Sequence, residues 1–581
     1  MTEATMNHPR TFTKELLSEL HTFLARQEKR FPRDETLTID LHCHDHNSST
    51  PDELLGRILN IPETWLPSED LIEILKGHGC DTFTVTNHNN ARSCHELREK
   101  GIDVLTGAEF TCQVPDYRVG IHVLAYGFTP NQETMLDRLR SDIYKFQEYA
   151  LANDIPTIWA HPLYHYHRGE MPPLEFFDKM ALVFERFEVM NGQRDTWQNM
   201  LAKIFVEGLT RDRIDSLAKK FKIPPNRYCK NPYRKAMAGG PDSHMGIFTG
   251  LTGTRLHVED LPEKLKIMGR SKLALEAIKA GAMAPFGSHN DSEKMTVSFL
   301  DYFCQIAMHM EDPGLIRMIL HKGDAREKLF ALAIANGMAE IKRHRVTMNF
   351  LQLFHQCFSG NVPSFRKRLM VPKVYKPIFD EASHMAVTRR DNPDEIVHKF
   401  KDSIHLIYES LSRILMERLQ AKLEKMDGDH NFKEMKAENI FKAFELPTQI
   451  RKYAEAGARK NGDAAPLNLT EFLDGLSFPF LGSAVILSAT FASARVMYNS
   501  RALLTKFSEN LGKLKHPHRM LWLTDTFEDV NGVAMVLRSM LDEIRKRDLP
   551  IDILVCSSTL KSEDHLIVVP PLGEYTFSFY E

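Results

Sequence analysis

Short apolar runs alternate with helical patterns through the N-terminal half of the chain, and this alternation is the feature that most constrains the fold. Residues 37–42, 82–86, 104–110, 119–126, 157–160, 184–190 and 236–240 have the composition of strands. Helical patterns separate most of these runs, for example at 68–77, where Ser68 is the expected N-cap, and at 131–153. Such repetition predicts an α/β protein with a parallel barrel rather than a sandwich.

Histidines and acids stand at or near the ends of these runs. His42 and His44 end the first run, and because side chains two apart share a face of a strand, they can bind one metal ion together. Taken singly, each such histidine is more often an ordinary core or surface residue. In a barrel, however, the carboxyl ends of the strands meet at one rim, so the spacing predicts a shared metal site. The candidate ligands are His42, His44, His88, Glu109, His122, His161, Asp242 and His244.

Six short motifs resemble those of the PHP (polymerase and histidinol phosphatase) family of metal-dependent phosphoesterases. They are Asp-Leu-His-Cys-His, Thr-Asn-His-Asn, Gly-Ala-Glu-Phe-Thr, Ala-His-Pro, Phe-Glu-Val-Met-Asn-Gly and Gly-Gly-Pro-Asp-Ser-His. The resemblance covers residues 37–291 and implies a distorted seven-stranded (β/α) barrel. It also implies two or three divalent ions of zinc, manganese or iron.

The resemblance further implies how the ligands divide among the ions. One ion would take His42, His44, Glu109 and Asp242, which are the residues expected to be catalytic. A second would share Glu109 and take His122 and His161, and a third would take His88 and His244. A shared carboxylate suits such a cluster because its negative charge screens the repulsion between the cations.

Two positions depart from the family pattern. Ser49 stands where the family usually has an Asp or His ligand, which leaves two outcomes open: a dinuclear site, or a replacement ligand from Asp45 or His46. Asn87 stands where an acid is usual, and its amide would keep a hydrogen bond to its neighbour but lose the charge.

The activity implied by the resemblance is hydrolysis of a small phosphate ester by a metal-bridged hydroxide. Arg92, Arg118 and Arg194 are candidates to bind the phosphate, together with His165 or His167. The alternative function is a catalytically weak, metal-binding regulatory or scaffold subunit that partners a glycosyltransferase, which the substitutions at Ser49 and Asn87 favour.

The rest of the chain predicts three further parts. Residues 1–36 form a helical extension, residues 292–515 a helical region, and residues 516–581 a short α/β unit. In the last part, a strand at 520–523, a helix at 534–546 and a strand at 551–556 predict one βαβ unit. The loop 524–533 resembles that of retaining family-four GT-B glycosyltransferases, although the second Rossmann-like domain of those enzymes would be missing here. A glycosyltransferase chain is therefore an expected partner rather than an activity of this chain.

Composition narrows the compartment and the partners. With 74 basic and 77 acidic residues, the formal net charge of −3 gives no bulk field to attract nucleic acid. Eight cysteines without CxxC pairs, and no apolar leader after the first methionine, favour the reducing cytoplasm. The uncharged run 475–494 contains Pro479 and Gly482, so we expect a buried or interfacial helix rather than a membrane span.

Overall fold

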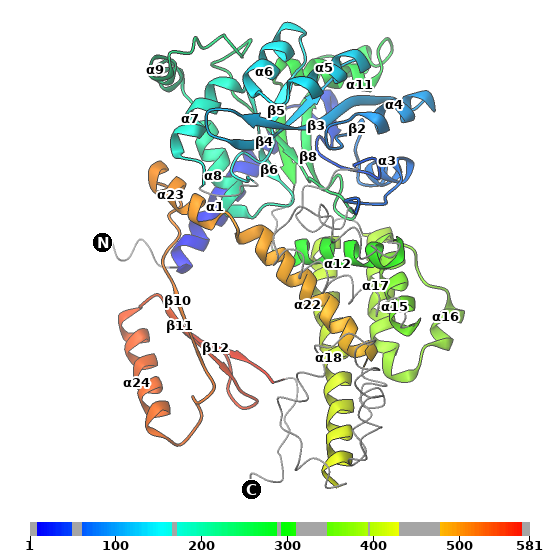
Figure 1. Ribbon diagram of the computed structural model, residues 1–581, viewed down its shortest axis with the longest axis vertical. Coiled ribbons are helices and arrows are strands. Elements are labelled where there is room, and N and C mark those ends of the chain that lie inside the picture. The colour runs from blue at the N-terminus through cyan, green and yellow to red at the C-terminus, as the bar shows by residue number, and fades with distance from the viewer. Residues whose placement is uncertain are drawn as a thin grey trace, which may run out of the picture. The chain divides into compact units, whose positions relative to one another are not determined.

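The computed structural model describes residues 9–48, 61–165, 171–287, 292–309, 345–392, 395–428 and 477–571 (Figure 1). The chain divides into two compact units, one of Met1–Gln305 with Thr490–His518 and the other of Ile306–Ala489 with Arg519–Glu581. Ser49 and His167 lie outside the described residues. The predicted boundaries at 36, 291 and 515 stay predictions.

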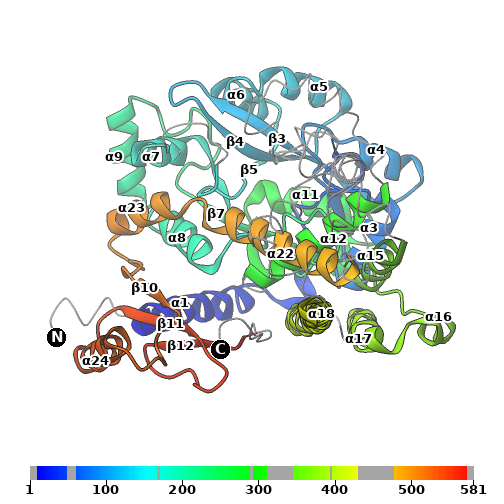
Figure 2. The same ribbon diagram turned by 60° about the horizontal axis from the view of Figure 1, so that its bottom comes forward.

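Two sheets form the centre of the first unit, and helices lie outside them (Figures 1 and 2). The larger sheet pairs six strands in chain order: β2(Phe83–Val85), β3(Val104–Val114), β4(Val119–Tyr126), β5(Thr157–Trp159), β6(Arg186–Asn191) and β7(Ala236–Gly240). The smaller, antiparallel sheet has the order β1(Thr36–Ile39), β8(Thr252–His257), β9(Met283–Gly287). The α/β class is confirmed, and all seven predicted runs contain a strand, whereas β8 and β9 were not predicted.

The all-parallel arrangement was wrong at two pairings. β3 pairs antiparallel with β4, and β4 pairs antiparallel with β5, while the remaining neighbours in the large sheet are parallel. The reason lies in the connection between β3 and β4, which consists of residues 115–118 only. A parallel crossover needs a dozen or more residues, so this short turn forces a hairpin.

The segment that follows β1 lies between the two ends of the large sheet. The Asp242 N–H, just beyond β7, donates to the His42 carbonyl at 2.8 Å, and the His44 N–H donates to the Ser243 carbonyl at 3.0 Å. On the other side, the Thr86 N–H beyond β2 donates to the Cys43 carbonyl at 2.8 Å. Residues 42–44 therefore link the carboxyl ends of β7 and β2 through backbone hydrogen bonds, and they close the gap between the two edges of the curved sheet.

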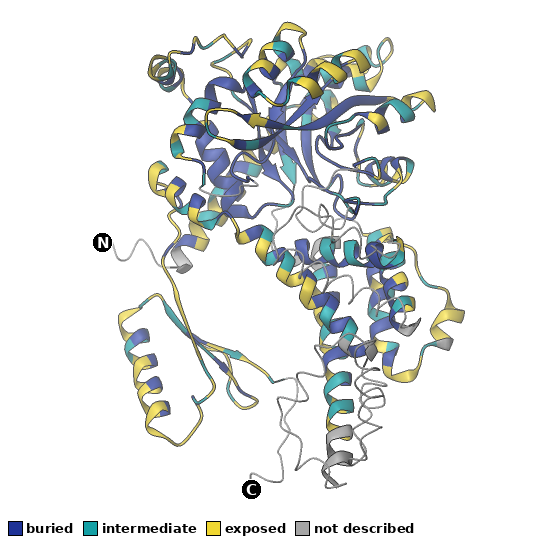
Figure 3. Cartoon of the chain, viewed as in Figure 1, coloured by how far each residue is buried: buried dark blue, intermediate teal, exposed yellow. Residues whose placement is uncertain are grey.

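Helices follow most strands of the first unit. They are α1(Pro9–Glu28), α3(Ser68–Gly77), α4(Arg92–Glu99), α5(Pro130–Leu139), α6(Ile143–Ala152), α7(Leu174–Val183), α8(Thr196–Glu207), α9(Arg211–Phe221), α10(Leu261–Lys264) and α11(Arg270–Ala280), with a short 3₁₀ turn at Arg33–Glu35. The single helix predicted at 131–153 is two helices, because the Asp142 side chain accepts the N–H of Tyr144 and starts α6 there. Strands and inner helix faces are buried, while the outer faces of the helices are exposed (Figure 3).

A late segment of the chain completes the core of the first unit. Helix α23(Arg501–Leu511) buries Phe507, whose ring centroid lies 5.0 Å from that of Phe177 in α7 and 5.5 Å from that of Phe205 in α8. The Trp197 indole N–H donates to the Leu514 carbonyl at 2.8 Å. α23 belonged to the predicted helical region, yet its apolar face packs on the α/β core.

The second unit consists of helices and a small sheet. Its helices include α15(Arg345–Phe358), α16(Phe365–Met370), α17(Lys376–Asp391) and α18(Ile396–Gly428), with a 3₁₀ turn at Lys373–Tyr375. Two further helices, α12(Ser292–His309) and α22(Ser477–Tyr498), contain the boundary between the units. Buried Phe358 and Phe400, with ring centroids 5.7 Å apart, join α15 to α18.

The small sheet pairs β10(Met520–Thr524), β11(Ile551–Cys556) and β12(Leu566–Val569) in parallel, with α24(Gly532–Arg547) between the first two strands. The predicted βαβ unit is therefore confirmed, although its likeness to a glycosyltransferase stays a prediction. Leu537, Leu541 and Ile544 of α24 pack on one face of the sheet. The edge strand β10 remains open, because its residues 520–523 are between 37 % and 67 % exposed.

One stretch, Leu481–Leu511, is long and apolar enough to cross a membrane by length and composition. In its most apolar window, 39 % of the residues are buried. The part in α23 is a core helix of the first unit, where Leu504 and Phe507 are buried. A single such stretch is weak support for a membrane span.

Candidate metal centre

Five strands of the large sheet and the segment after β1 bring the eight predicted ligands to one place. Glu109 lies within β3 and His122 within β4, and the remaining ligands follow β1, β2, β5 and β7. Four overlapping groups of His, Glu and Asp have ligand atoms within 4.8 Å of one another, and together these groups contain all eight residues. The buried His/Glu/Asp cluster of the first unit is therefore able to bind metal ions.

Glu109 divides its two carboxylate oxygens between two sets of imidazoles. Its Oε2 lies 3.2 Å from His42 Nε2, 3.3 Å from His44 Nε2 and 3.2 Å from His88 Nδ1. Its Oε1 lies 2.8 Å from His122 Nδ1 and 3.4 Å from His161 Nε2. A carboxylate that faces two ligand sets is arranged as a bridge between two cations.

Asp242 completes the first set opposite Glu109. Its Oδ1 lies 3.5 Å from His42 Nε2 and 3.7 Å from His44 Nε2. Ligand atoms around a tetrahedral ion with bonds of about 2.0–2.1 Å lie about 3.3–3.4 Å apart, so these separations suit a common cation. Within the described part of the chain, His42 Nε2, His44 Nε2 and both Glu109 oxygens are buried and have no hydrogen-bond partner. Such atoms are costly unless a ligand satisfies them, and the residues therefore fit a metal.

Glu63 is a ligand candidate that the sequence did not reveal. Its Oε2 lies 3.4 Å from His88 Nε2 and 3.3 Å from His244 Nε2, and the group His44, Glu63, His88 and His244 could hold an ion. Glu63 comes from the segment between β1 and α3, outside any strand. The only sequence signal was an acid within the apolar stretch Ile61-Pro62-Glu63-Thr64-Trp65.

Among the described residues, neither Asp45 nor His46, the two proposed replacements for Ser49, belongs to a group of ligand atoms that could hold an ion. The Asp45 carboxylate accepts hydrogen bonds from Asn87 Nδ2 at 2.7 Å, Ser93 Oγ at 2.7 Å and Ser68 Oγ. The His46 side chain is 43 % exposed and lies 4.0 Å from Asp45. Asp45 thus places a carboxylate beside Asn87, where the family pattern has an acid. The predicted N-cap at Ser68 was wrong, because Pro67 is the N-cap of α3 and the Ser68 hydroxyl donates to Asp45 instead.

Glu188 in β6 orients two of the ligands. Its Oε1 lies 2.9 Å from His42 Nδ1, and its Oε2 accepts the His161 backbone N–H at 2.9 Å. A carboxylate on the far nitrogen of a ligating imidazole fixes its tautomer and leaves Nε2 to face the ion. A Cβ at Gly240 would lie 2.5 Å from the His42 Cβ and 2.8 Å from Glu188 Oε1, so this strand end must be glycine.

Two ligands sit on strained backbone. His161 has φ 30° and Asp242 has φ 52°, in the left-handed region that residues with a Cβ seldom adopt. Conformations of this kind cost on the order of 1–3 kcal/mol each and concentrate at functional sites. Here they turn two side chains toward the cluster immediately after β5 and β7.

Charge pairing dominates the electrostatics of the centre. Burial alone would raise the pKa of the Glu109 carboxyl, but the charges of His42, His122 and His88 lower it well below its usual range. Burial alone would lower the pKa of His42, yet Glu109 and Glu188 raise it well above the ordinary value. Without metal, a proton therefore remains on the His42 imidazole, and a bound cation must displace it.

The other imidazoles differ among themselves. Burial lowers the pKa of both His44 and His161, and this keeps their nitrogens neutral and able to bind a metal. Burial also acts on His244, but Glu63 outweighs it and raises the pKa of that imidazole. In turn, burial would raise the pKa of Glu63, whereas His88 and His244 lower it well below its usual value.

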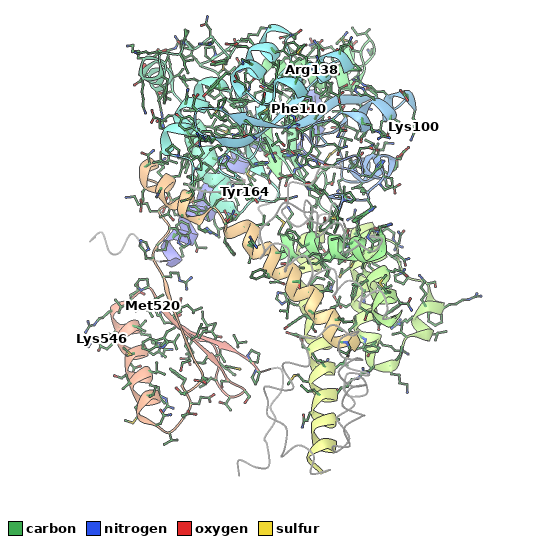
Figure 4. The ribbon with its side chains drawn as sticks, viewed as in Figure 1. Lys100, Phe110, Arg138, Tyr164, Met520 and Lys546 are labelled. Carbon is green, nitrogen blue, oxygen red and sulfur yellow. The ribbon has the colours of Figure 1, made fainter. Side chains whose placement is uncertain are left out.

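The three arginines expected to bind phosphate lie in different places. Arg194 is buried, with Nη2 3.3 Å from Asp242 Oδ2 and its guanidinium carbon 3.4 Å from the ring centroid of Tyr164, which Figure 4 labels. Arg92 is 70 % exposed and pairs with Glu96, and Arg118 is exposed in the turn between β3 and β4. The structure brings only Arg194 to the centre.

Of the two histidine candidates for phosphate binding, only His165 lies within the described residues. His165 packs among aromatic rings, with its ring centroid 5.4 Å from that of Phe176 and 5.8 Å from that of Phe177, so it belongs to the core.

Comparisons with known proteins do not establish a family for this chain. No protein-family model matches the chain, and a search of curated proteins also found no match. Among solved structures, the chain is similar to a protein from Bifidobacterium adolescentis that is proposed to be a metal-dependent phosphoesterase. The identity is 13 %, the alignment covers 35 % of this chain and 86 % of that chain, and the TM-score is 0.21.

Proposed function

We propose that the chain is a metal-dependent phosphoesterase of the PHP type that hydrolyses a small phosphate ester. The observation that carries this proposal is the division of the Glu109 carboxylate between two sets of imidazoles, with Asp242 opposite it. This arrangement is suited to two adjacent divalent cations, and enzymes that hydrolyse phosphate esters commonly use such pairs.

We assign the ligands to the ions as the resemblance implies, with one addition. His42, His44, Glu109 and Asp242 would hold one ion, and Glu109, His122 and His161 a second. Glu63 would join His88 and His244, with His44 nearby, at a third. When bound, zinc, manganese or iron ions would supply a hydroxide nucleophile at neutral pH and stabilise the charge on phosphorus.

The protein's own side chains position the substrate and keep the ligands in place. Arg194 donates to Asp242 and lines the cavity beside His161, so its guanidinium lies where it can bind a phosphate oxygen. The Tyr164 ring beneath the guanidinium limits its rotation. Glu188 orients the His42 imidazole through a hydrogen bond to Nδ1. Hydrolysis would therefore depend on Glu188, which positions a ligand and does not contact the substrate.

The test is hydrolysis by the purified full chain. We expect the protein loaded with Mn²⁺, Zn²⁺ or Fe²⁺ to release phosphate from simple esters, and Asp242→Asn to abolish that release. Arg92→Ala serves as the control, because Arg92 is exposed and pairs with Glu96 away from the cluster. If none of the three metals supports hydrolysis that Asp242→Asn removes, the proposal is wrong.

A second function is favoured by one observation in the other unit. The edge strand β10 exposes Met520, Leu521 and Leu523, and an open apolar edge of this kind is a common place for another chain to bind. This suits a metal-binding scaffold or regulatory subunit that partners a glycosyltransferase. Retention of metal by the pure protein without hydrolysis of any ester would favour this function over the first.

A further inference from the structure

A cavity opens directly beside the candidate metal centre and has two chemically different walls. Its empty volume, including the open mouth, is about 730 Å³. One wall consists of the ligands and their neighbours, namely Glu63, His88, His122, His161, Gln193, Arg194, Asp242 and His244. The other wall consists of Met245, Met295, Ser298, Phe299, Tyr302 and Val496.

Helix α12 provides most of the second wall and is held against the metal-ligand loops. The Tyr302 hydroxyl donates to the Pro62 carbonyl at 3.3 Å, next to Glu63. One turn later, the Gln305 side chain accepts the Trp65 N–H at 3.2 Å and donates to Met245 Sδ at 3.3 Å. These bonds hold the helix at the cavity, which Phe299 and Glu63 both line.

The second wall offers very little polar chemistry. Among its described residues, Ser298 and the Tyr302 hydroxyl carry the only side-chain oxygens, and the latter already donates to Pro62. On the first wall, Gln193 donates to the Asp242 carbonyl and Arg194 contacts the Asp242 carboxylate. A sugar or polyol placed against the second wall would lose hydration of its hydroxyl groups without new partners, which costs free energy for each hydroxyl.

We propose that the ester cleaved at this centre has an apolar, aromatic alcohol as its leaving group, which packs on Phe299, Met245 and Met295 while the phosphate faces the ligands and Arg194. This inference rests on the proposed phosphoesterase function and specifies its substrate class. An aromatic ring fits a wall of methionine and phenylalanine because sulfur and ring edges both pack favourably on its face.

The experiment compares esters whose alcohols are similarly basic, so that differences in rate report binding rather than leaving-group chemistry. The full chain with Mn²⁺ is assayed on methyl, phenethyl and glycerol phosphates. We expect kcat/KM for phenethyl phosphate to exceed that for the other two by about 10- to 200-fold. The Phe299→Ala variant is expected to lose most of this preference.

Phe303→Ala is the matched control, because Phe303 lies on the same helix next to Phe299 but does not line the cavity. Binding of methylphosphonate and phenethylphosphonate, measured by calorimetry, gives a readout independent of turnover. If Phe299→Ala fails to fold, Phe299→Leu replaces it, with a smaller loss expected. Equal binding of the two phosphonates, or equal effects of Phe299→Ala and Phe303→Ala, would overturn this inference alone. Absence of hydrolysis of every ester would instead overturn the proposed function.

Discussion

Replacing Glu63 with glutamine tests the least expected part of the centre. Gln keeps the shape of Glu63 but removes the carboxylate that lies 3.3 Å from His244 Nε2 and 3.4 Å from His88 Nε2. A cation held by His88 and His244 would lose the attraction of this carboxylate, and even for two unit charges 3.4 Å apart that attraction is about 5 kcal/mol at an effective dielectric constant of about 20. Dehydration of the buried carboxylate offsets part of this attraction, and we take about 2–3 kcal/mol as the net loss. That corresponds to roughly 100-fold weaker binding of one ion.

The assay is a metal count after dialysis, with competition against a chelator to give the affinity. We expect Glu63→Gln to lose about one ion per chain while the ions beside Glu109 remain. Glu133→Gln is the matched control, because Glu133 also faces an imidazole, that of His95 at 2.9 Å, but does so away from the cluster. The same metal content and affinity in Glu63→Gln and in the unmodified chain would show that Glu63 binds no ion.

Three further predictions address positioning, protons and packing. Glu188→Gln should weaken metal binding by about 10- to 100-fold, because His42 loses the carboxylate that orients it, and chelator competition measures this. Metal uptake at neutral pH should release protons, because the pKa values of His42 and His244 are raised in the metal-free protein. Apparent affinity should therefore rise with pH through these raised values; calorimetry in buffers of different ionisation enthalpy measures the protons, and a pH-independent affinity would contradict the argument. Phe507→Ala should lower the free energy of unfolding by about 3–5 kcal/mol in urea titrations, whereas Phe491→Ala, at an exposed site, should change it little.

Strand positions in the first unit could be predicted because each buried strand is a short, local apolar run. β4 and β7 have the predicted bounds, and the metal-ligand candidates follow from where such runs end. The direction of pairing could not be read in the same way. The prediction that β3 and β4 are parallel was wrong, because an apolar run shows where a strand lies but not its direction, and the turn at 115–118 is too short for a parallel crossover.

Seven strands of the first unit, the βαβ unit and eight polar residues with the chemistry of metal ligands can be predicted from the amino-acid sequence alone. The folded chain was needed to show that Glu63 joins His88 and His244, that Asp45 lies beside Asn87, and that Arg194 alone of the three arginines lies at the centre. Apolar periodicity is a local property of the chain, whereas a ligand set depends on which distant loops meet. A carboxylate from a segment without regular structure has no period, and its role depends on where the folded chain places it.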